Sequence, residues 1–107
     1  MAIQIPQTAV EEYCRQWQIV RMSLFGSALR EDFRPDSDID VMVEFSTTAD
    51  HNVFDLSVMR RELESLLGRR VDLVERRLVE ESANYIRRRQ ILESAEVIYG
   101  PGSGVSA

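Results

Sequence analysis

The segment Leu24–Phe45 contains the residues whose types and spacing could support chemistry. Gly26 and Ser27 follow an apolar run, and Asp38 and Asp40 enter another apolar run ten residues later. Residues two apart on a strand point to the same face, so the two carboxylates would lie side by side. They repel each other and are costly to desolvate, and a divalent cation removes both costs. Mg²⁺ prefers oxygen ligands of this kind and often shares them with substrate phosphates.

A phosphate site is predicted beside these carboxylates. Gly26 lets the backbone approach a ligand closely. Ser27 would open a short helix and present its hydroxyl and backbone N–H groups to an anion, and Arg30, one turn on, could reach the same phosphate. Asp72 has the equivalent alternating position on a later strand. If that strand lies beside the Asp38–Asp40 strand, three carboxylates converge, enough for two metal ions roughly 4 Å apart. The alternative is that the aspartates only keep an exposed edge strand soluble.

The elements that must position these residues are predicted from apolar periodicity and turn residues. Strands are expected over 19–25, 39–45 and 71–75, with Val97–Tyr99 as a short packed extension. In the 39–45 strand, alternate apolar residues face the core, and Asp38, Asp40 and Glu44 share the other face. Helices are expected from a capping box at Thr8 to about Gln18, over 28–33, from an N-cap at Asn52 to Gly68, and over about 80–94.

Two helices have predicted packing faces. In the helix after Asn52 the residues expected to pack are Val53, Leu56, Met59, Leu63, Leu66 and Leu67. In the last helix they are Ala83, Ile86, Ile91 and Leu92. Cys14 and Trp17 are expected to be core residues and not catalytic residues. His51, the only histidine, and Glu44 are expected to be solvated.

The amino-acid composition argues against several classes of function. The chain has 107 residues, of which 44% are hydrophobic and 29% charged, so we expect one domain over 1–99 and a flexible tail over 100–107. A net charge of −5 argues against general nucleic-acid binding. All 13 basic residues are arginine, which excludes a lysine nucleophile or a P-loop lysine. We expect no membrane span and no secretory signal. A single cysteine, Cys14, fits a cytoplasmic protein.

The combination of Gly26-Ser27 with Asp38-Ile39-Asp40 resembles the signature of the DNA polymerase β-like nucleotidyltransferase superfamily. The runs RPDSDIDVMVEF and LLGRRVDLVE are similar to the minimal nucleotidyltransferase (MNT) family, over about residues 15–99. The resemblance implies an α/β (α+β) fold with a small mixed sheet and packed helices. It also implies transfer of AMP from ATP, with Mg²⁺ (two ions) held by Asp38, Asp40 and Asp72. Gly26, Ser27 and Arg30 match the phosphate-binding positions. Glu31 departs from the glycine common after that arginine.

The resemblance also implies a partner. Many MNT proteins are antitoxins of HEPN ribonuclease toxins, and some are similar to enzymes that place AMP on a toxin tyrosine. Arg87–Arg89 is a candidate partner surface. Two alternatives remain open. One is an antitoxin that acts by binding alone, and the other is a nucleotidyltransferase for a small molecule such as an aminoglycoside, for which a homodimer could build the acceptor pocket.

Overall fold

The computed structural model describes residues 5–26 and 38–100, in which four strands form one mixed sheet. The sheet has the order β3-β2-β1-β4. β1 is antiparallel to both β2 and β4, and β2 is parallel to β3. The strands are β1 (Ile19–Phe25), β2 (Ile39–Phe45), β3 (Val71–Glu75) and β4 (Glu96–Tyr99). The three predicted strands are confirmed, and the predicted extension at 97–99 is a fourth strand.

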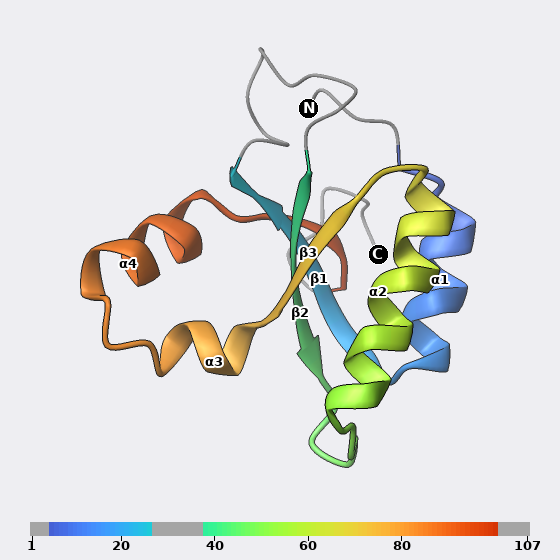
Figure 1. Ribbon diagram of the computed structural model, residues 1–107, viewed down its shortest axis with the longest axis horizontal. Coiled ribbons are helices and arrows are strands. Elements are labelled where there is room, and N and C mark those ends of the chain that lie inside the picture. Colours follow the sequence, from blue (N-terminus) through green and yellow to red (C-terminus); the bar gives the residue numbers. More distant parts are fainter. Residues whose placement is uncertain (1–4, 27–37, 101–107) are drawn as a thin grey trace.

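Four helices pack around this sheet in the part of the chain that is described. They are α1 (Gln7–Gln16), α2 (Val53–Leu67), α3 (Arg76–Glu80) and α4 (Tyr85–Ser94). Figure 1 shows α1 and α2 side by side on one side of the sheet, with α3 and α4 extending from the other side. The mixed sheet with packed helices confirms the predicted fold class. The expected helix over 28–33 lies outside the described residues.

The alternation along β2 separates two cores. Ile39, Val41 and Val43 are fully buried and pack with residues of α1 and α2, among them Cys14 and Met59. The other face of the sheet has a smaller cluster under α3 and α4, made of Phe25, Met42, Val79 and Ile91. The predicted orientation of β2 is therefore confirmed, with its carboxylates on the side of α3 and α4.

The ends of α2 form as the sequence predicts. The backbone N–H of Asp55 donates to Asn52 Oδ1 at 2.9 Å, and that of Asn52 donates to Asp55 Oδ2 at 3.0 Å. Gly68 ends the helix with φ of 72°. Val53 was expected to pack, and this was wrong, because its side chain is 80% exposed. At about 100° of rotation per residue, Val53 lies roughly a quarter turn from the direction shared by Leu56 and Met59.

Two other helix boundaries differ from the prediction. α1 begins at Gln7 after Pro6, and Thr8 does not cap it, because the Val10 N–H already donates to the Pro6 carbonyl at 3.0 Å. The helix ends at Gln16, and the left-handed φ of 60° at Gln18 turns the chain into β1.

The predicted helix over about 80–94 begins later than expected, as α4 at Tyr85, and residues 76–80 form the separate short helix α3, which the sequence did not predict. Ser82 Oγ accepts from the Asn84 N–H at 3.2 Å, and Asn84 Oδ1 accepts from the Arg87 N–H at 3.1 Å. Such local bonds offer the backbone an alternative to the helical pattern, so residues 81–84 are not helical. Ile91 and Leu92 pack as predicted, whereas Ala83 and Ile86 are exposed. No helix in the described ranges is long and apolar enough to span a membrane.

Candidate active site

Strand register brings two of the predicted carboxylates together. Asp40 of β2 is paired with Asp72 of the parallel neighbour β3. The next pair along, Met42 and Val74, belongs to the cluster under α3 and α4, so both aspartates share that face of the sheet. Neighbouring strands lie about 4.8 Å apart. The condition set by the sequence, that the third strand lies beside the second, is therefore met.

Gly26 lies directly against Asp40. Phe25 of β1 is paired with Asp40 of β2, and Gly26 is the next residue after Phe25. Its φ is 68°, in the left-handed region. A Cβ built on Gly26 would lie 3.2 Å from Asp40 Cγ and would overlap the Oδ2 atom. The glycine thus leaves the space that the Asp40 carboxylate occupies, a role that the sequence did not indicate.

Asp38 lies at the start of this acidic row and is half exposed. Its Oδ1 is 3.2 Å from Nε of Arg70, which stands just before β3. Among residues 5–26 and 38–100, no three acidic, histidine or cysteine side chains are grouped closely enough to hold a metal ion. Asp40 and Asp72 are adjacent, while Asp38 is engaged by Arg70. The predicted set of three metal ligands therefore stays a prediction.

An open cavity of about 630 Å³ borders Gly26 and Asp40. Its opposite wall is formed by α4, which contributes Arg87, Gln90 and Ser94. These positions follow the spacing i, i+3 and i+7, so one helix face lines the cavity. The volume is in the range of small-molecule sites, about 300–1,000 Å³. None of these three α4 residues was predicted to line the site, although their polar i, i+3, i+7 spacing was the available signal.

The other predicted phosphate-binding residues, Ser27 and Arg30, lie outside the described residues, as does Glu31. Gly26 is the described member of that motif. Because β1 and β2 are antiparallel, the chain leaves β1 after Gly26 at the edge of the sheet where β2 begins with Ile39. Gly26 and the first residues of β2 therefore lie at one edge of the sheet.

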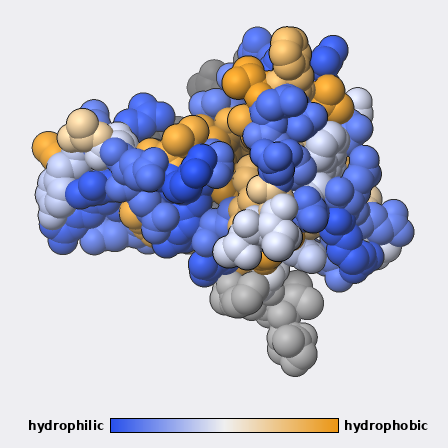
Figure 2. Space-filling model, turned by 90° about the horizontal axis from the view of Figure 1, so that it is seen from below, coloured by the Kyte–Doolittle hydropathy of each residue, from blue (hydrophilic) through white to orange (hydrophobic). Residues whose placement is uncertain are grey.

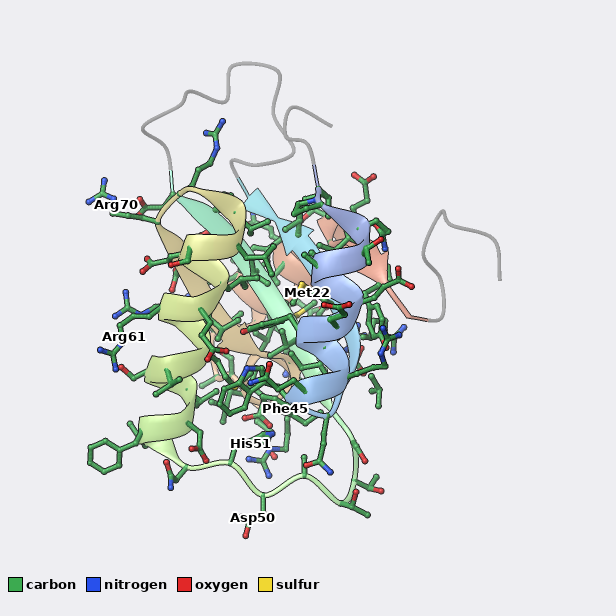
Figure 3. All side chains as sticks on the ribbon, turned by 90° about the vertical axis from the view of Figure 1, so that its right-hand side faces the viewer. Met22, Phe45, Asp50, His51, Arg61 and Arg70 are labelled. Atoms are coloured by element: carbon green, nitrogen blue, oxygen red, sulfur yellow. The ribbon has the colours of Figure 1, made fainter. Side chains whose placement is uncertain are left out.

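The two residues expected to be solvated lie at the far end of β2. His51 Nε2–H donates to the Trp17 carbonyl at 2.7 Å, and its ring contacts Phe45 edge-on at 4.7 Å. Its side chain is 13% exposed, so the expectation was wrong. Glu44 pairs with Arg21 and Arg76 and is likewise not solvated. Figure 3 shows Phe45 and His51 together at the end of the molecule opposite Arg70, so neither His51 nor Glu44 belongs to the candidate site.

Comparison with known proteins identifies relatives over most of the chain. The family described as "Nucleotidyltransferase domain" matches residues 7–98. A protein of Methanocaldococcus jannaschii, provisionally named a protein adenylyltransferase, is 39% identical over 56 residues. These residues are 52% of this chain and 58% of that protein, so the alignment spans less than two thirds of the relative.

Several solved structures share this fold. A structure provisionally described as a minimal nucleotidyltransferase is 36% identical, with a TM-score of 0.63, and the match covers 83% of this chain and 85% of that one. A toxin–antitoxin structure with AMP-PNP has a TM-score of 0.68 at 24% identity, covering 90% and 74%. A complex of a tri-AMPylated Shewanella oneidensis HEPN toxin with its MNT antitoxin has a TM-score of 0.57 at 23% identity, covering 88% and 69%. The toxin–antitoxin structures support the fold assignment.

Proposed function

Because this chain belongs to the nucleotidyltransferase-domain family, we propose that it transfers AMP from ATP to a HEPN-type toxin and thereby acts as the toxin's antitoxin. The acceptor in this proposal is a tyrosine hydroxyl. The likeness to a protein provisionally named a protein adenylyltransferase supports the reaction type. The likeness in fold to an MNT antitoxin bound to an AMPylated HEPN toxin supports the choice of partner. We place the reaction in the cytoplasm because ATP is its substrate.

The observation that carries the proposal is the contact between Gly26 and Asp40. It joins the end of the phosphate-binding motif to the centre of the acidic motif, and Asp72 lies beside Asp40 on the next strand. A nucleotidyl transfer needs this juxtaposition, since the phosphate that is bound must also be the phosphate that reacts. A sheet with aspartates kept only for solubility has no need of a left-handed glycine packed on one of them.

The donor set fits Mg²⁺. Asp38, Asp40 and Asp72 would hold the proposed two ions, and carboxylate oxygens are the ligands that Mg²⁺ takes in such sites. Binding metal would require Asp38 to give up its ion pair with Arg70. An ion pair this exposed typically contributes about 0–1 kcal/mol, so its loss costs little free energy. Bound metal would supply charge neutralisation on the phosphates and on the leaving pyrophosphate.

Residues of this chain would bind the phosphates and accept the proton. Gly26, Ser27 and Arg30 would bind and orient the phosphates through backbone N–H groups, the hydroxyl and the guanidinium. The acceptor oxygen would bond to the α-phosphorus as the bond from that phosphorus to the pyrophosphate oxygen breaks, and pyrophosphate would leave. A tyrosine hydroxyl has a pKa near 10 and needs a base at neutral pH. Asp72, at the outer end of the row, would accept this proton.

The proposal is tested by intact mass. The chain would be purified and incubated with ATP, Mg²⁺ and the protein encoded beside its gene, which the proposal expects to be the HEPN-type toxin. Asp40→Asn would be compared with Asp50→Asn, the same substitution at an exposed position of the loop before α2, at the opposite end of the sheet (Figure 3). We expect AMP-sized mass increments on the toxin with wild type and Asp50→Asn, and none with Asp40→Asn.

Each other outcome has a clear meaning. If wild type and Asp40→Asn both bind and silence the toxin with no added mass, the chain is a binding antitoxin and the enzymatic proposal is wrong. If a small hydroxylated compound such as an aminoglycoside gains AMP and the toxin does not, the acceptor class is wrong and the reaction type is retained.

A further inference from the structure

We infer that Arg87 of α4 is a nucleotide-binding residue that contacts a phosphate group of the bound substrate. This inference rests on the proposed function and adds a residue outside the glycine and aspartate motifs. It starts from the cavity of about 630 Å³ that Gly26 and Asp40 share with α4. The nucleotide must enter this space to reach Asp40.

Charge in the cavity singles out Arg87. The acidic side chains that line it are Asp40 and Glu93, and Arg87 is the one cationic side chain among its described lining residues. Asp72, paired with Asp40, adds negative charge nearby. A polyphosphate approaching these carboxylates is repelled, so a cation on the opposite wall has a direct effect on its affinity.

The neighbouring arginines are already occupied. Arg88 Nη1 donates to the carbonyls of Glu80 and Ser82, and Arg89 donates to Glu93 at 2.9 Å. The guanidinium of Arg87 makes no hydrogen bond or ion pair with any described residue, although its backbone N–H is bound by Asn84. A guanidinium has five donors suited to bidentate phosphate contacts, and no described residue uses those of Arg87.

The surroundings of Arg87 favour a ligand over a structural role. Its side chain is exposed and lies on the same helix face as Gln90 and Ser94, above the buried Ile91. Figure 2 shows hydrophilic side chains over much of the visible face of the lobe formed by α3 and α4. Arg87 also lines a second cavity with Val79 and Ile91, but its side chain is exposed, so its replacement should leave the fold intact.

The test is equilibrium binding of AMP-PNP in the presence of Mg²⁺ and without any toxin, measured by calorimetry. The variants are Arg87→Gln, Arg87→Lys and Arg61→Gln. Arg61 is a matched control because it is an exposed arginine on α2, which lies on the opposite side of the sheet (Figures 1 and 3). Competition by adenosine, which has no phosphate, is measured for each variant.

We expect Arg87→Gln to weaken AMP-PNP binding by about 10- to 100-fold, as for the loss of a charge-assisted hydrogen bond, and to leave adenosine competition unchanged. Arg87→Lys should recover part of the loss, and Arg61→Gln should bind like wild type. Equal affinity of wild type and Arg87→Gln would overturn the inference and leave the proposed function standing. An equal loss for AMP-PNP and adenosine would overturn the phosphate contact. A wild-type chain that binds no nucleotide would refute both.

Discussion

Replacing Gly26 with alanine tests the geometry of the site most directly. With φ of 68°, any residue with a Cβ at this position is strained by about 1–2 kcal/mol. The added methyl would also overlap the Asp40 carboxylate, with the Asp40 Cγ 3.2 Å away. The carboxylate can turn aside, at a rotamer cost of about 0.5–1.5 kcal/mol. We therefore expect the free energy of unfolding to fall by about 1.5–3.5 kcal/mol.

Gly68 provides the matched control. Its φ is 72°, nearly that of Gly26, but a Cβ there would meet nothing within 4 Å. Gly68→Ala should therefore show the backbone strain alone, about 1–2 kcal/mol. The difference between the two variants isolates the contact with Asp40. Urea denaturation followed by circular dichroism gives both values from the same two-state analysis.

Activity should separate the two variants more sharply than stability. Displacing a reacting group by about 1 Å can cost about 100-fold in rate, so Gly26→Ala should lose about that much AMP transfer. Gly68→Ala should stay close to the wild-type rate at a temperature where both variants are folded. The reasoning is refuted if Gly26→Ala keeps wild-type activity, or if Gly68→Ala loses as much.

Two further predictions concern stability. Asn52→Ala removes the side-chain half of the capping box of α2 and should lower the free energy of unfolding by about 0.5–2 kcal/mol in urea titrations, whereas an unchanged midpoint would contradict the role of the cap. Burial raises the pKa of the Cys14 thiol from 9.0 to about 12, so the unfolded chain loses this proton first as the pH rises. The stabilisation is complete below pH 9 and is lost between pH 9 and about 12, at up to about 1.4 kcal/mol per pH unit. Denaturant titrations across this window should show a shallower decline for Cys14→Ala, and equal slopes would contradict the assignment.

The strands and their faces could be predicted because their signal is local. In β2, Ile39, Val41 and Val43 are buried on one face, whereas Asp40 and Glu44 on the other face are partly exposed. The boundaries of α2 were equally local, since Asn52 with Asp55 and then Gly68 each act within one turn of the chain. At Thr8 the same kind of signal failed, because the helix is capped at Pro6, two residues earlier.

The contacts that were missed depend on partners distant in sequence. His51 is mostly shielded from solvent because Trp17 and Phe45, from two other parts of the chain, contact its ring. Glu44 is engaged because Arg21 and Arg76 come from neighbouring elements. No pattern around a single residue contains this information.

The candidate site was predictable only in part, because its motifs are local but the contacts between them are not. The motifs named Gly26, Asp40 and Asp72, but strand pairing decides that they are neighbours. The wall formed by α4 depends on the helix break at Ser82–Asn84, which turns the helix to face the sheet edge. The break itself comes from two side-chain bonds that compete with a helix the sequence also favours.

The antiparallel ladder of β1 and β2 has a consequence for how such sites evolve and are searched for. Cross-strand hydrogen bonds, and not the length of the connection, set the distance between Gly26 and Asp40. Insertions or deletions between Ser27 and Asp38 can therefore accumulate in descendants while the glycine stays against the carboxylate. Losing one residue inside β2 ahead of Asp40 would instead turn that carboxylate toward the apolar core. A search that requires ten intervening residues will pass over relatives whose catalytic geometry is the same.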